Sequence, residues 1–166
     1  MAITYEAIQT TTLGSAASSI TFGSIAASWT DLRIVWTGTV TTSATRLQMQ
    51  FNSDTATNYS GTYLYSGGGY FGSGRVTNQT YLRWNQDAQL STTIPVMNTV
   101  DIFSYAGSTY KTCLISNIND LNGSGSVVPQ VGLWRNTAAI TSIVIYTLAN
   151  TMAIGTTATL YGIKAA

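Results

Sequence analysis

Few residues in this sequence could carry out acid–base or nucleophilic chemistry. Among 166 residues there is no histidine, one cysteine and six carboxylates. The lack of histidine excludes Ser-His-Asp and Cys-His catalysis, histidine-based zinc sites and the usual general base near neutral pH. The carboxylates are scattered over expected turns and strand starts, whereas a glycosidase needs two that flank one bond; they are Glu6, Asp31, Asp54, Asp87, Asp101 and Asp120. We therefore predict that the protein is not an enzyme and has no catalytic residues.

Cofactor and metal sites are also not indicated. The glycine-rich stretch Ser66–Gly74 lacks the lysine and the following helix of a phosphate loop, so we interpret it as a break in a strand that forms a mobile tip. The oxygen-rich segment Asn117–Gly123 has one carboxylate and does not match the spacing of a calcium loop. Cys113 lies in an apolar run and is predicted to be a buried thiol. We expect no cofactor and no metal.

One positive cluster combines aromatic and guanidinium side chains around the glycine-rich stretch. Tyrosine, tryptophan and arginine are enriched at protein interfaces, because they bury much area and keep a polar group, and aromatic rings also stack on sugars. The alternative that Tyr63, Tyr81 and Trp84 are core residues stays open at this point. The candidates for interface or glycan contact are Tyr65, Tyr70, Phe71, Arg75 and Trp84.

The overall composition argues against charged partners. Charged residues make up 8% of the chain and the formal net charge is +1, so there is no long-range field to attract nucleic acid or an anionic membrane. No apolar run reaches the length of a membrane span, and Met1–Thr12 has no export signal, so we expect synthesis in the cytoplasm. The length fits a single domain over residues 1–166.

The elements that must position these residues are predicted to be strands. Arg46–Phe51 alternates apolar and polar residues, as does Thr157–Ile163. Ser142–Tyr146 is continuously apolar at its centre, which predicts a strand covered on both faces that closes one sheet together with Thr157–Ile163. Further strands are expected at Ile20–Phe22, Asp31–Val40, Tyr59–Tyr65, Tyr81–Trp84, Thr99–Tyr105, Thr109–Ile115 and Val127–Trp134.

Nine or ten such strands predict an all-β fold, a two-sheet antiparallel sandwich of jelly-roll or lectin-like type. The count alone does not separate a sandwich from a barrel. Asn117–Ser126 is predicted to be a long polar loop, and Pro129 to place the following strand at an edge or a bulge. Residues 1–13 are predicted to form either an edge strand or an extended N-terminal arm.

Four segments carry a resemblance to a known family: Leu47–Ser60, Asp101–Thr112, Val131–Ser142 and Gly155–Ala166. With these segments the chain resembles, along most of its length, small virion structural proteins of tailed bacteriophages, including those of cyanobacterial hosts. In that family the sandwich serves as a trimeric, lectin-like capsid decoration (cement) protein or as the terminal domain of a tail fibre.

The resemblance implies a non-enzymatic capsid decoration protein of the virion that binds the major capsid protein and stabilises the outside of the head. It also implies a homotrimer. The first segment is then the expected capsid anchor, because its alternation suits addition to a sheet edge, with Ile3, Tyr5 and Ile8 as the candidate residues. The alternative is a tail-fibre or receptor-binding module that recognises a host surface glycan.

Overall fold

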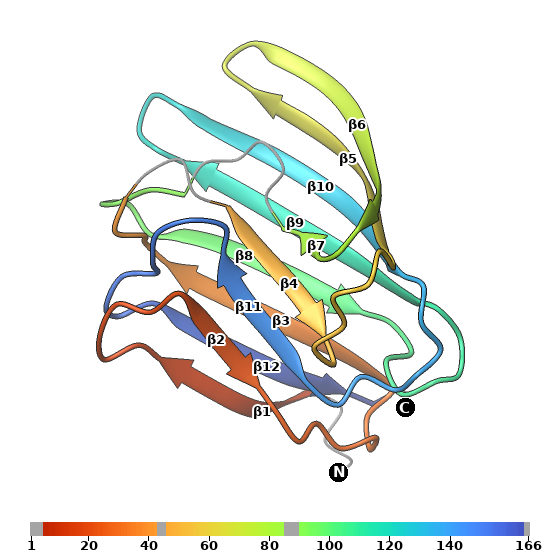
Figure 1. Ribbon diagram of the computed structural model, residues 1–166. Helices are drawn as coiled ribbons and strands as arrows, with labels where there is room; N and C mark the ends of the chain where they lie inside the picture. Colours follow the sequence, from red (N-terminus) through yellow and green to blue (C-terminus); the bar gives the residue numbers. More distant parts are fainter. Residues whose placement is uncertain (1–4, 43–45, 85–89, 165–166) are drawn as a thin grey trace.

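The computed structural model describes residues 5–42, 46–84 and 90–164, and these form two packed antiparallel sheets without a helix (Figure 1). The predicted all-β sandwich is confirmed. Twelve strands are present in the described ranges, more than the sequence indicated. Within these ranges there is also no helix long and apolar enough to cross a membrane.

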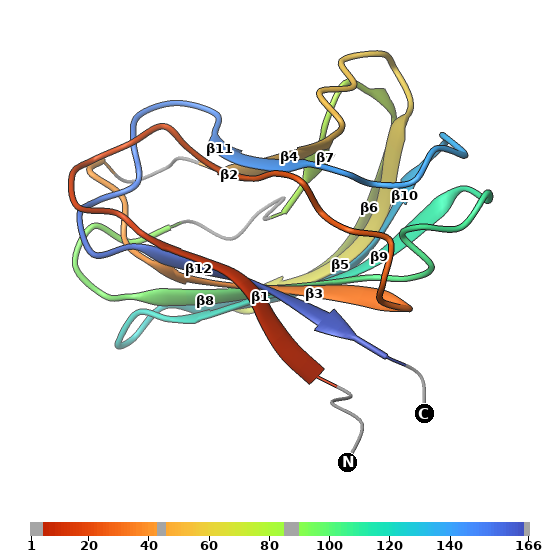
Figure 2. The same ribbon diagram turned by 90° about the horizontal axis from the view of Figure 1, so that it is seen from below.

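The large sheet has eight strands. In spatial order they are β1 (Tyr5–Thr12), β12 (Thr157–Ile163), β3 (Asp31–Gly38), β8 (Val96–Ile102), β9 (Lys111–Asp120), β10 (Gly125–Trp134), β5 (Tyr59–Gly67) and β6 (Tyr70–Gln79). The small sheet has the order β2 (Ser19–Phe22), β11 (Ile143–Thr147), β4 (Leu47–Phe51) and β7 (Leu82–Arg83). Figure 2 shows the small sheet as a layer over the large one, which curls up at its β5–β6 end.

The core lies between the two layers, and period-two alternation places it there. On β3, Leu32, Ile34 and Trp36 are fully buried, while the residues between them are partly exposed. On β4 the opposing layer contributes Leu47 and Met49, also fully buried. The alternation predicted for Thr157–Ile163 is present on β12, where the even-numbered positions are the buried ones.

Two predictions about the C-terminal strands are wrong. β11 pairs with β2 and β4, whereas β12 pairs with β1 and β3, so the two strands lie in opposite sheets and do not close one sheet. Val144 on β11 is half-buried between fully buried Ile143 and Ile145, so that strand is covered on one face only. β-Branched residues without interruption are compatible with a half-exposed central strand because they suit the pleated surface on either side.

The predicted loop at Asn117–Ser126 is also wrong, because β9 and β10 pair throughout Lys111–Trp134 and leave only a short turn at 121–124. Pro129 lies in β10, which is an interior strand rather than an edge. It is opposite Ser116 on β9, and the pairing of β10 with β5 is interrupted between Val127 and Gln130. The missing proline N–H therefore falls where the ladder to β5 is open.

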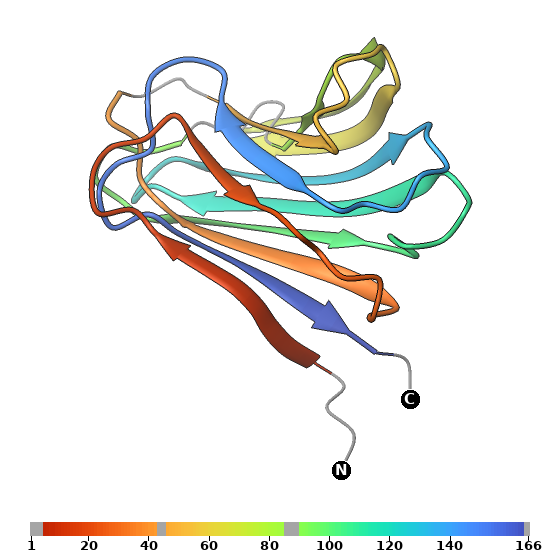
Figure 3. The same ribbon diagram turned by 60° about the horizontal axis from the view of Figure 1, so that its bottom comes forward.

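The first and last strands lie side by side. In Figure 3 the start of β1 and the end of β12 lie on the same side of the molecule, where β1 forms the sheet edge next to β12. Of the two forms predicted for residues 1–13, the described part is an edge strand. Ile3 lies outside the described residues.

Candidate functional site

The glycine-rich stretch forms a hairpin instead of breaking a strand. β5 and β6 pair from Gly67 and Tyr70 onwards, and the turn residues Gly68 and Gly69 have φ of 58° and 83°. A two-residue turn with both φ values positive matches the right-handed twist of the flanking strands, and glycine adopts it without steric cost. The prediction of an interrupted strand is therefore wrong.

The remaining glycines of the hairpin make room for tyrosine rings. A Cβ at Gly72 would come within 2.5 Å of the Tyr65 ring, and one at Gly74 within 2.5 Å of the Tyr63 hydroxyl. Both tyrosines therefore lie flat over their cross-strand glycine partners, and the two ring centroids are 6.3 Å apart. Aromatic cover of strand glycines is a known way to stabilise a ladder that lacks side chains.

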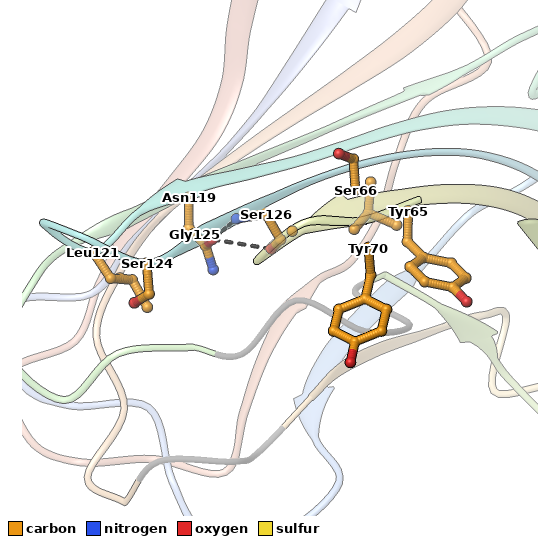
Figure 4. Close-up of a pocket in the computed structure, with 10 residues that line it drawn as sticks. Tyr65, Ser66, Tyr70, Asn119, Leu121, Ser124, Gly125 and Ser126 are labelled. Atoms are coloured by element: carbon orange, nitrogen blue, oxygen red, sulfur yellow. Dashed lines mark hydrogen bonds between the residues drawn. The ribbon is translucent and has the colours of Figure 1, made fainter. Parts of the chain in front are cut away.

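The hairpin separates the predicted contact residues onto two faces. Tyr65 and Tyr70 lie on the inner side, which is continuous with the core face of the large sheet, whereas Phe71 and Arg75 lie on the outer side. Figure 4 shows the Tyr65 and Tyr70 rings on one side of the hairpin and Ser66 pointing to the other. The structure corrects the prediction for Trp84: it is fully buried between the sheets and belongs to the core.

The outer side of the large sheet carries an exposed apolar surface that the sequence analysis missed. It extends over β8, β9, β10, β5 and β6, and pairing of the strands brings its residues into rows, for example Met97, Ile118 and Val127 side by side. Each is 46% to 78% exposed. The residues of this outer apolar face are Leu64, Phe71, Met97, Leu114, Ile118, Val127 and Val131.

Among the residues that the structure describes, the charged groups of the outer apolar face lie towards its ends. At one end Arg33 makes a two-pronged ion pair with Asp101, with N···O distances of 2.5 and 2.9 Å. That hydrogen bonding raises the pKa of Arg33. At the other end Arg75 borders a hollow of about 350 Å³ together with Thr62 and Val131. The centre of the face is built from aliphatic residues, threonine and serine.

One sequence signal could have revealed this face. The run Cys113-Leu114-Ile115 in β9 has no polar residue between apolar ones, and we used it only to predict a buried thiol at Cys113. In the structure Cys113 and Ile115 are fully buried while Leu114 is 46% exposed on the outer side. A continuous apolar run in a sheet with only one covered face means apolar residues on the open face as well.

The inner side of the hairpin borders a pocket of about 460 Å³. It lies where β9, β10, β5 and β6 extend at the end of the sandwich, and Figure 4 shows its lining. Asn119 Oδ1 accepts hydrogen bonds from the Ser126 backbone N–H at 2.7 Å and from the Ser126 hydroxyl at 3.0 Å. The other residues that line it are Tyr65, Ser66, Gly67, Tyr70, Leu121, Ser124, Gly125 and Val128.

Besides Asp101, three of the carboxylates accept hydrogen bonds from nearby groups of the chain. Asp54 Oδ2 accepts from the Trp134 indole N–H at 2.8 Å and from the Asn58 amide at 2.9 Å. Partial burial raises the pKa of Asp54, but these hydrogen bonds and one from the Ala56 N–H outweigh it, so the pKa is lowered. The carboxylates of Asp31 and Asp120 each accept a backbone N–H.

Glu6 lies exposed on β1, and Asp87 lies outside the described residues. Among the residues that the structure describes, no group of three or more His, Cys, Asp or Glu side chains is arranged to hold a metal ion.

Two further polar groups lie in the interior. Cys113 is fully buried, as predicted, and burial raises the pKa of its thiol, which makes it a poor nucleophile. Lys111 is fully buried as well, and its ammonium donates to the carbonyls of Gly107 at 2.7 Å and Thr109 at 2.5 Å. Burial lowers the pKa of Lys111. Lys111 stabilises the turn whose carbonyls it binds, and neither buried group faces an open site.

The predicted capsid anchor is an edge strand with one open side. β1 pairs with β12 from Tyr5 to Thr12, with a bulge between Ala7 and Gln9, and no described strand pairs with its other side. Tyr5 is 46% exposed and stacks on Tyr161 with centroids 4.7 Å apart. Ile8 is half-buried against the core.

Comparison with known proteins gives no assignment. No protein-family model matches the chain, and the search of curated proteins finds none that matches it. The function must therefore be inferred from the two faces of the large sheet.

Proposed function

We propose that this protein is a non-enzymatic structural protein of a tailed-phage virion, a capsid decoration protein that binds the major capsid protein on the outside of the head. The observation that carries the proposal is the outer apolar face. Soluble monomers seldom expose large contiguous apolar patches, and such patches mark interaction sites. Here seven large apolar residues lie on one open sheet face.

The charge pattern supports a partner bound by apolar contact. The net charge is +1, and the charged groups that the described residues place near the outer apolar face, Arg33 with Asp101 and Arg75, stand towards its ends. Binding should therefore survive about 1 M salt, where the Debye length is only about 3 Å. The hydrogen-bonded carboxylates and the poorly reactive Cys113 are consistent with a binding role rather than catalysis.

Assembly as a homotrimer belongs to the same proposal. A closed ring would bury part of the exposed apolar surface and sheet edges that a free monomer leaves in water. Light scattering of the purified protein should then give three times the chain mass of 17.7 kDa. A monomer mass in solution and on the particle would contradict this part of the proposal.

The open side of β1 supplies a second contact. It presents unpaired backbone groups beside Tyr5, and a strand of the shell protein could extend the large sheet there. This contact would set orientation, while the outer apolar face supplies most of the affinity.

The test is decoration of isolated heads by purified protein, measured by co-sedimentation. Val131→Lys places a charge in the middle of the outer apolar face and should weaken binding about tenfold or more. Ile154→Lys is the matched control, because Ile154 is 69% exposed in a loop away from that face. Equal binding by both variants would rule out the outer apolar face as the contact. Quantified gels of whole particles should show the copy number of a head-covering protein.

A further inference from the structure

The inner pocket lies on the opposite side of the large sheet from the outer apolar face. Its walls are the hairpin tyrosines on one side and the β9–β10 turn on the other (Figure 4). A volume of about 460 Å³ falls in the range of small-molecule sites. The pocket is therefore available whether or not the outer face is covered.

None of the ten residues that line the pocket carries a charge. Its polar groups are the hydroxyls of the two tyrosines, of Ser124 and of Ser126 and the amide of Asn119, because the Ser66 side chain points to the other side of the hairpin. Arg75, the nearest arginine of the hairpin, lies on the outer side. A lining of this kind has nothing to balance an anion or a cation, so the ligand it suits is neutral.

The positions of the Tyr65 and Tyr70 rings indicate which shape of ligand fits the pocket. Tyr65 is held over Gly72, while Tyr70 at the end of the hairpin is 77% exposed and has a free ring face. An exposed aromatic ring in a polar setting gains free energy when a flat apolar surface covers it. The C–H face of a pyranose ring is such a surface, and its rim of hydroxyls matches the serines.

We propose that the inner pocket binds a neutral hexose unit of a glycan. The sugar ring stacks on Tyr70 against the Tyr65 side of the pocket. Its hydroxyls pair with Ser124 and with the Ser126 hydroxyl, which already donates to Asn119 and so accepts from the ligand. This site does not depend on the proposed capsid contact, because the two use opposite faces, and either can fail without the other.

The experiment is saturation-transfer NMR on the full chain with five probes. D-glucose, D-galactose and N-acetyl-D-glucosamine are the neutral sugars, and D-glucuronate and adenosine are the charged and the aromatic comparison ligands. We expect transfer to the ring protons of at least one neutral sugar with millimolar affinity. Transfer to none of the three, or stronger transfer to glucuronate or adenosine, would overturn the proposal.

Variants locate the site. Tyr70→Ala should weaken sugar binding about threefold to tenfold, the loss typical of one aromatic contact. Phe71→Ala is the matched control, because Phe71 is the next residue, 78% exposed and on the outer side. Ser124→Trp fills the pocket from an exposed turn position and should abolish binding without touching the core. Binding that persists in both Tyr70→Ala and Ser124→Trp would show that the sugar sits elsewhere.

Discussion

Inner and outer residues alternate along the strands at both ends of the large sheet, but the two ends differ in how far the inner residues are buried. At the β12–β3–β8 end the inner residues lie under the small sheet, and Trp36 is fully buried with its indole N–H 3.3 Å from the Met152 sulfur. At the β5–β6 end every residue of β6 is exposed or half-exposed. The covered end is thus held by apolar burial, and the hairpin by its backbone ladder and by tyrosines lying on glycines.

The comparison explains where binding surfaces can arise. Residues under the small sheet stabilise the fold, since truncating one of their side chains leaves a cavity in the core. The residues of β6 are exposed or half-exposed on both sides, and the outer side of the hairpin is apolar while its inner side borders a polar pocket. Binding functions are therefore expected at the uncovered end, where substitution costs little stability.

The substitution expected to change stability most is Trp36→Ala at the covered end of the large sheet. It removes a fully buried ring and should lower the free energy of unfolding by about 3–5 kcal/mol. Tyr70→Ala at the hairpin should change it by less than about 0.5 kcal/mol. Urea unfolding monitored by circular dichroism measures both. Similar losses for the two variants would remove the distinction between the ends.

A smaller loss is expected for Asp54→Ala at the junction of β4 and β5. The change leaves the buried Trp134 indole N–H without its acceptor and removes two other hydrogen bonds, so a loss of about 1–3 kcal/mol is expected. Because the folded pKa of Asp54 is below its ordinary value of 3.8, this stability is present above that pH and is lost as the pH falls. The wild type and the variant should therefore converge in melting temperature in acid, and a constant difference would contradict the assignment.

Alkaline pH should destabilise the core between the two sheets. Burial raises the pKa of Tyr146 on β11 from 10.0 to about 12, and burial also raises the pKa of Tyr59 at the start of β5, where its ring packs on Phe51. A raised folded pKa means stability that is complete below pH 10.0 and is lost as the pH rises through the folded value. The melting temperature of the wild type should fall between pH 9 and pH 12, and the melting temperature of Tyr146→Phe should fall less steeply. Parallel curves for the two proteins would exclude Tyr146 as a cause.

The smallest effect concerns the hairpin ladder. Gly72→Val introduces a Cβ where the Tyr65 ring lies and should cost about 1 kcal/mol or less globally, because the ring can move outwards into solvent. Amide hydrogen exchange gives the local readout: β6 should exchange faster than β3 in the wild type and faster still in the variant. Ser73→Val, at the neighbouring outer position, is the control and should leave exchange in β6 unchanged.

Much of the local structure was predictable from the sequence. The strands at Asp31–Gly38, Leu47–Phe51 and Thr157–Ile163 were expected within one or two residues, because an alternation of period two is a local property of the chain. The buried thiol of Cys113 followed from its apolar neighbours. The hairpin at Gly68–Gly69 was missed because its glycines were interpreted as a mobile tip, although two successive glycines are also a hairpin signal.

Other features were decided only by the tertiary structure, because strand pairing joins residues that are far apart in the sequence. β11 and β12 both alternate buried and half-buried residues in the structure. Even so, β11 meets β4 from about 90 residues away and enters the small sheet, while β12 closes on β3. Trp84 and Tyr70 are both aromatic residues of the same region, but only Trp84 falls under the second layer. An alternating pattern says which residues share a face of a strand; whether that face meets a second sheet or water depends on where the other sheet ends.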